Sequence, residues 1–215
     1  MITPLDLTNR IGELDNALSW LESCTKDQVP LYSTTKLDIC SSLLQHAQRI
    51  AGSILVLLAR EHPNGAFALA RPLFEGYVRG VWAFECADEQ ELLDIFDEKS
   101  DENGRTKKFP GFSKAIDDIS THNSFHSPWI SKASKKLSVL HDWVHGGIQT
   151  CARNFDDDNA QPRYPLSHQL DLLDSFVQPI MFQSGIALLG VLDLDQRHTE
   201  LTFAQVIGQK LDFLQ

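Results

Sequence analysis

The sequence predicts a single all-α domain spanning 1–215, folded as a helical bundle of about 6–8 helices. Apolar residues recur at helical spacing through most of the chain, whereas the alternating or β-branched runs that indicate strands are scarce. The composition, 42% hydrophobic and 22% charged, is typical of a globular protein. A chain of 215 residues is also long enough to bury a substantial core.

The first half of the chain contains four segments that we expect to be helical. Leu5–Cys24 carries one apolar stripe of an amphipathic helix. The cluster Ser33–Thr34–Thr35 is suited to cap a long helix that runs to about Glu61 and is stopped by the breaker His62–Pro63–Asn64–Gly65. A third helix, which we expect to be kinked, extends from about Ala66 to Cys86, and an acidic helix follows at 88–100.

The second half begins with a polar stretch at 101–111, where Asn103–Gly104 and Pro110–Gly111 are turn signals and predict a mobile loop. The remaining elements are expected in this order: a short helix near 113–121, the segment Ser127–Asn154, a second loop at about 155–165, a long helix at about Leu166–Leu192 and a final helix at Glu200–Leu214. Within the long helix, Pro179 predicts a kink.

The net charge of −10 argues against broad, sequence-independent binding of nucleic acid, which needs a basic surface. The charge is unevenly distributed, because 88–103 is strongly acidic and 105–136 is basic. The basic residues of that second segment are Arg105, Lys107, Lys108, Lys114, Lys132, Lys135 and Lys136. We therefore expect a local basic face.

Neither a membrane nor a cofactor is indicated. The longest apolar run, Ile50–Ala59, is about half the length of a bilayer-spanning helix, and the N-terminus has no hydrophobic signal region. These features predict a cytoplasmic protein. The four cysteines, Cys24, Cys40, Cys86 and Cys151, form no CxxC pair and are interpreted as reduced core thiols.

A charged stripe crosses the otherwise apolar third helix. Arg71, Glu75 and Arg79 are spaced four residues apart and so share one side of the helix. One interpretation is a structural network in which both arginines share the glutamate. Gly76 and Gly80 lie in the neighbouring row, and each sacrifices about 1 kcal/mol of helix stability relative to alanine. A closely packed partner helix or a ligand cleft is therefore expected beside them.

The stretch LHDWVHGGIQT at 140–150 concentrates polar groups on another helix. His141 and His145 are four residues apart on one face, with Asp142 one position round from the first. One hypothesis is a metal-binding hydrolase, because H-D-W-V-H has the form of the zincin motif H-E-x-x-H. The aspartate is one methylene shorter than the glutamate of that motif, and no third ligand is evident downstream.

Two further hypotheses need no metal. In one, a histidine moves protons while Arg71 or Arg79 stabilises a developing negative charge, if the two helices pack through the Gly76/Gly80 and Gly146/Gly147 rows. In the other, the histidines are structural and cap carbonyls or bond Glu75. A second histidine pair, His122 and His126, is expected on a solvated loop.

The segments ARPLFEGYVRGVWAF (70–84) and LHDWVHGGIQT (140–150) resemble uncharacterised bacterial α-helical families. In these families a helix bearing R-x-x-x-E is followed, some sixty residues on, by a helix that ends in a histidine–glycine pattern. They are similar to the AbiV abortive-infection group and, more distantly, to the HEPN superfamily, which includes many ribonucleases of phage defence or toxin–antitoxin pairs. The resemblance implies a HEPN-like core and assigns Arg71 and Glu75 to the helix motif and His145 to the histidine.

The chain departs from the HEPN ribonuclease signature, an arginine followed four to six residues later by a histidine. That spacing is absent before His145, and it occurs instead at Arg163 and His168, with Pro165 between them.

Two functional hypotheses follow. The first is a metal-independent ribonuclease of bacterial defence, with His145 as acid/base, Arg71 and Arg79 as charge stabilisers, Glu75 as orienting residue and RNA received by the basic 105–136 face. The second is a non-catalytic helical module whose polar cluster supports a homodimer or an antitoxin-like protein partner.

Overall fold

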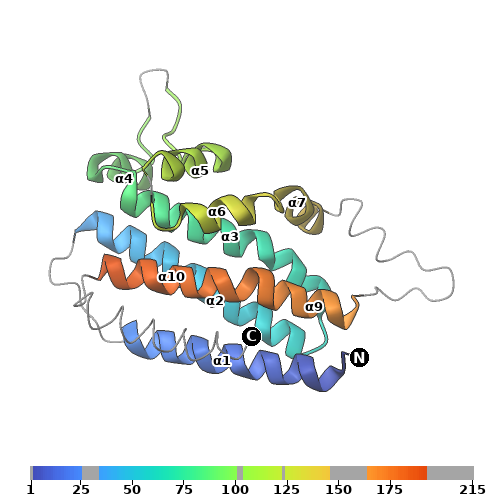
Figure 1. Ribbon diagram of the computed structural model, residues 1–215. Coiled ribbons are helices and arrows are strands. Elements are labelled where there is room, and N and C mark those ends of the chain that lie inside the picture. The colour runs from blue at the N-terminus through green and yellow to red at the C-terminus, as the bar shows by residue number, and fades with distance from the viewer. Residues whose placement is uncertain (1, 26–33, 101–103, 123, 146–163, 193–215) are drawn as a thin grey trace.

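The computed structural model describes residues 2–25, 34–100, 104–122, 124–145 and 164–192, and the regular elements within these ranges are helices (Figure 1). They are α1 (Pro4–Thr25), α2 (Thr35–Ala59), α3 (Pro63–Glu85), α4 (Glu89–Phe96), α5 (Phe112–Thr121), α6 (Ser127–Ser134), α7 (Leu137–His145), α9 (Leu166–Leu172), the π-helical η1 (Leu173–Val177) and α10 (Gln178–Val191). The prediction of an all-α bundle is confirmed. The predicted final helix at 200–214 lies outside the described residues.

The helix starts follow the capping chemistry of the sequence. Thr34 caps α2 by accepting a hydrogen bond from the backbone N–H of Leu37 at 3.2 Å. Asp88 does the same for α4, where its carboxylate accepts from the N–H of Glu91 at 2.7 Å. These side chains satisfy backbone donors that have no partner inside the helix.

The breaker between the second and third helices is shorter than predicted. α3 begins at Pro63, three residues before the predicted Ala66, because a proline at the first helical position has no N–H to leave unpaired. The turn itself is made by Arg60, Glu61 and His62, with Glu61 in the left-handed region at a φ of 60°. Pro72 lies inside α3, which continues past it as one helix.

The paired helices α2 and α3 form the centre of the bundle, and they make the most extensive contact between elements of the described structure. The small residues of α3 allow this approach. A β-carbon placed on Gly76 would lie 3.5 Å from Cβ of Ala47, and one placed on Gly80 would lie 2.7 Å from Cγ of Leu44. Of the two alternatives expected beside the glycines, a closely packed helix or a ligand cleft, the structure has the helix, and it is α2.

The expectation that the glycine row of α3 would face the histidine-bearing helix is wrong. Leu44 and Ala47 of α2 occupy that side of α3, and the histidine-bearing helix α7 contacts α3 elsewhere. Gly146 and Gly147, which were expected to form the matching row, lie outside the described residues.

A continuous run of helix, α9–η1–α10, packs against α1, α2 and α3 (Figure 1). Where the sequence predicts a kink at Pro179, the structure has the π-turn Leu173–Val177, in which the N–H of Gln178 bonds the carbonyl of Leu173. Proline removes one helical donor, and its ring crowds the carbonyl four residues back, so a wider turn directly before it relieves the clash.

Within the described residues one helix, Leu166–Val191, is long and apolar enough to cross a membrane. The longest uninterrupted apolar run of the sequence, Ile50–Ala59, is a different and shorter segment. Of the most apolar window of that helix, 72% is buried inside the bundle. This burial is consistent with the core helix of a soluble protein.

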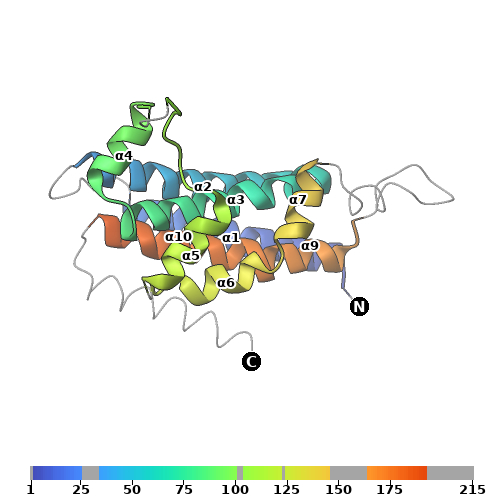
Figure 2. The same cartoon turned by 90° about the horizontal axis from the view of Figure 1, so that it is seen from above.

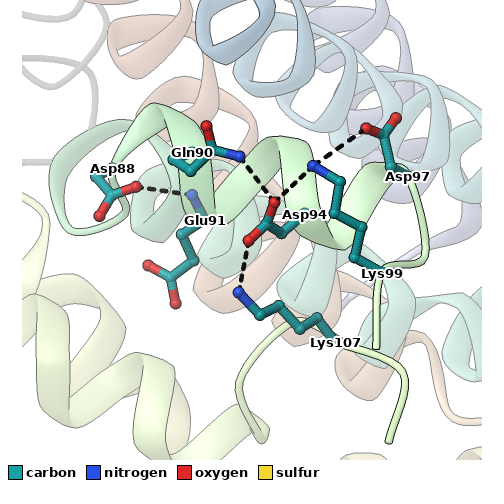
Figure 3. A network of polar contacts seen from close by, with 7 residues as sticks. All are labelled: Asp88, Gln90, Glu91, Asp94, Asp97, Lys99 and Lys107. Atoms are coloured by element: carbon teal, nitrogen blue, oxygen red, sulfur yellow. Dashed lines mark hydrogen bonds and ion pairs between the residues drawn. The ribbon is translucent and has the colours of Figure 1, made fainter. Parts of the chain in front are cut away.

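The connection from α4 to α5 is anchored by a polar network (Figure 3). The carboxylate of Asp94 accepts bonds from Lys107 at 2.5 Å, Lys99 at 2.9 Å and Gln90 at 2.8 Å. The bonds from Lys107 and Lys99 hold the pKa of Asp94 well below its ordinary range. An isolated bridge between Ser100 and Thr106 closes the stem of the predicted 101–111 loop, of which 101–103 lie outside the described residues.

The α2–α3 contact can be tested at Gly80. Gly80→Ala forces the new methyl against Leu44, which is fully buried, and overpacking of this kind costs about 1–3 kcal/mol, more than the roughly 1 kcal/mol that alanine adds to helix stability. We expect a net loss of stability in urea-induced unfolding. Gly12→Ala, at an open site of α1, is the control and is expected to stabilise. Stabilisation by both substitutions would contradict the close packing.

Candidate functional site

The charged stripe of α3 and the histidines of α7 meet in space. The guanidinium of Arg71 donates through Nε to Oε1 of Glu75 at 2.8 Å, and its Nη1 contacts Nδ1 of His141. The ring of His145 lies against that of His141, with centroids 4.3 Å apart. Glu75, Arg71, His141 and His145 therefore form one continuous row, which we call the Arg–His cluster.

Apolar contacts on the other side of α7 hold this helix in place. Leu140 is buried, and Trp143 packs edge-on against Phe67 of α3, with ring centroids 4.6 Å apart. α7 lies beside α3 (Figure 2), and its exposed His141 and His145 are at the surface next to Arg71. Asp142, one position further along the chain, is half-buried.

Arg79 lies at the edge of the cluster. Its Nη2 is 3.6 Å from Oε2 of Glu75, and its guanidinium carbon lies 6.0 Å from the ring centroid of Phe109. The side chain of Arg79 is 42% exposed, compared with 25% for Arg71 and 22% for Glu75. The cluster is therefore open to solvent, unlike the buried network that the sequence analysis considered.

The contact with Arg71 fixes the role of one nitrogen of His141. A guanidinium has only donors, so Nδ1 of His141 must accept, and in the neutral ring the proton is on Nε2. Nδ1 is thus occupied, and a fixed positive charge lies beside it. Within the described residues, no three His, Cys, Asp or Glu side chains converge as metal ligands. This arrangement is better suited to an anion than to a metal cation.

The comparisons with known proteins give a family but no function. A family of unknown function (DUF6988) matches residues 40–196. The chain belongs to this family. No curated protein and no solved structure gives a significant match. The matched range runs from α2 to α10, so the Arg–His cluster lies within the DUF6988 domain.

The face expected to be basic at 105–136 carries less free positive charge in the structure than the sequence suggests. Lys107 is paired with Asp94, and Lys114 lies 2.8 Å from the carboxylate of Asp118. Lys136 is 3.7 Å from Asp171 of α9. The carboxylates of Asp94 and Asp171 come from outside the segment, so the composition of 105–136 alone cannot reveal that they neutralise part of its charge.

His126 is buried, so the prediction of a solvated loop is wrong for this residue. Its Nδ1 lies 2.9 Å from the hydroxyl of Tyr77 and 2.8 Å from Oε1 of Gln183. Burial lowers the pKa of His126, although the bond to Gln183 opposes the shift. Burial also raises the pKa of Tyr77. Gln183 and Ser184 are polar residues within the apolar run IMFQSGIALL, and Gln183 was the sequence signal that a buried polar partner lies nearby.

The exposure of the Arg–His cluster predicts a small effect on stability. Glu75→Ala is expected to lower the free energy of unfolding by about 1 kcal/mol or less, because partly exposed ion pairs contribute little. Denaturant unfolding of the two proteins measures the difference. A loss of 3 kcal/mol or more would show instead that the cluster behaves as a buried network.

The buried His126 predicts a pH dependence. The pKa of His126 in the folded state lies below the ordinary 6.5. As the pH falls below 6.5, His126 is therefore protonated in the unfolded chain before it is protonated in the folded protein. Stability is therefore lost toward low pH, with a slope from this one group of at most about 1.4 kcal/mol per pH unit. His126→Asn should flatten the stability curve between pH 7.5 and 5, whereas His122→Asn, at an exposed position, should not. Equal slopes in all three proteins would refute this.

Proposed function

We propose that this DUF6988 domain is a metal-independent ribonuclease of the HEPN-like, bacterial-defence type, acting through the Arg–His cluster. The observation that carries the proposal is the contact between Arg71 and His141 across α3 and α7, with the exposed His145 against it. An anion-binding guanidinium beside solvent-reachable imidazoles provides both parts of acid–base cleavage of a phosphodiester.

Each group has a distinct role in the proposed reaction. His145 takes the proton from the 2′-hydroxyl of RNA, whose oxygen forms a bond to phosphorus while the bond from phosphorus to the 5′-oxygen breaks. The same proton is returned to the leaving 5′-oxygen. Arg71 and the Nε2–H of His141 donate to the non-bridging oxygens, and Glu75 orients Arg71. The products are a 2′,3′-cyclic phosphate and a 5′-hydroxyl.

Arg79 supplies a second positive charge at the edge of this site. Its side chain is more exposed than that of Arg71, and its Nη2 is 3.6 Å from Glu75, a longer contact than the 2.8 Å from Arg71 to the same carboxylate. We assign it to the adjacent phosphate of the RNA chain. Asp142, on the same helix as His141 and His145, remains a candidate site residue, but the proposed cleavage reaction gives it no role of its own.

Cleavage of a single-stranded RNA pool in EDTA tests the proposal. His145→Ala should reduce the rate about 10²–10⁴-fold, and Arg71→Ala about 10²–10³-fold. His46→Ala and Arg49→Ala, which replace exposed residues of α2, are the matched controls and should retain the wild-type rate. A substrate with one deoxyribose at the cleaved position should resist, because the attacking hydroxyl is missing.

Each other result has a defined meaning. Cleavage that survives in both His145→Ala and Arg71→Ala would remove the assignment to this cluster. Cleavage abolished by EDTA and restored by zinc would favour the metal-binding hydrolase suggested by the HDWVH motif. The absence of cleavage by the wild-type protein would leave the non-catalytic module, for which a homodimer or an antitoxin-like protein is the expected partner.

A further inference from the structure

A cavity of about 250 Å³ lies away from the Arg–His cluster, between α6, η1, α10 and the middle of α3. Its floor is formed by the buried side chains of Phe74, Tyr77 and Gln183. Its rim is formed by Trp129, which is 38% exposed, and by the exposed Lys132 and Lys136. The floor is aromatic with two polar groups, and the rim is cationic.

The positive charge at the rim is only partly neutralised. The ammonium of Lys132 lies 5.2 Å from the ring centroid of Trp129, and no carboxylate pairs with it within the described residues. Asp174, the acidic residue of the lining, is already bound by Arg10 of α1 at 2.5 Å. Lys136 lies 3.7 Å from Asp171, so the ammonium of Lys132 is the main positive charge that this rim offers to an anion.

One wall of the cavity is formed by Asp174, Ser175 and Phe176 of the π-turn η1. Pro179, which follows this turn in α10, lines the same wall. The π-turn at this wall is also of a kind that is frequent at functional sites.

The two polar groups of the floor share one partner, His126. Tyr77 and Gln183 both contact Nδ1 of His126, which is itself buried behind them. Burial raises the pKa of Tyr77, so the floor presents a hydroxyl and an amide rather than a charge. Such groups suit the uncharged polar edge of a ring, whereas the lysines at the rim suit a phosphate.

We propose that this cavity binds a small nucleotide, with its base among the aromatic side chains and its phosphate at Lys132 and Lys136. Base–aromatic contact and a charge-assisted bond to phosphate are the interactions that this combination of residues provides. The volume of about 250 Å³ lies just below the usual range of about 300–1,000 Å³ for ligand pockets, and so favours a single nucleotide unit. The site contains no residue of the Arg–His cluster and does not depend on the proposed ribonuclease activity.

Calorimetric titration of the full-length protein with AMP and UMP tests the site, with adenosine, uridine and inorganic phosphate as partial ligands. At least one nucleotide should bind more tightly than its nucleoside and than phosphate. Lys132→Gln should weaken nucleotide binding about tenfold through loss of the charge-assisted bond and leave nucleoside binding unchanged. Trp129→Leu should weaken the binding of nucleotide and of nucleoside, because both contain the base. Lys135→Gln removes an adjacent exposed lysine that does not line the cavity and should bind like the wild type.

Circular dichroism of each variant establishes that it is folded before titration. The proposal is overturned if neither nucleotide binds more tightly than inorganic phosphate, which would indicate general attraction of anions. It is also overturned if Lys132→Gln and Lys135→Gln have equal effects. A defect in RNA cleavage in the His145→Ala protein with normal nucleotide binding would show that the two sites are separate.

Discussion

The close approach of α2 and α3 is the constraint on which the rest of the structure depends. Gly80 and Gly76 leave room only for Leu44 and Ala47 of α2, so this side of α3 is fixed against one partner. Arg71, Glu75 and Arg79 lie about 100° round the helix from the glycine row. They are therefore turned away from α2 toward α7 and solvent, where their charges remain hydrated and α7 can bring imidazoles to them.

The two candidate sites draw on different physical properties of the same bundle. The Arg–His cluster is a solvent-open row of charges and imidazoles, assembled by two helices that apolar contacts hold together. The cavity at α6 and η1 is a hollow with an aromatic floor and exposed lysines at its rim. α3 contributes to both, through Arg71 and Glu75 on one side and through Phe74 and Tyr77 on another.

Proline has opposite consequences at two places in the chain. At Pro63 it begins α3, since the first helical residue needs no N–H partner. At Pro179 it falls inside a long helix, where the missing N–H and the bulk of the ring are accommodated by the π-turn Leu173–Val177. That turn shapes one wall of the cavity. A local property of one residue type thus determines a helix boundary in one case and a candidate site in the other.

The sequence by itself determined the fold class, most helix boundaries and the shared face of Arg71, Glu75 and Arg79, because helical periodicity and capping depend on residues a few positions apart. It also indicated that Gly76 and Gly80 need a close neighbour. Only the tertiary structure decided that this neighbour is α2, that Arg71 meets His141, and that His126 is buried against Tyr77 and Gln183. These contacts join residues 29 or more positions apart. They are set by the packing of whole helices, which no local sequence pattern encodes.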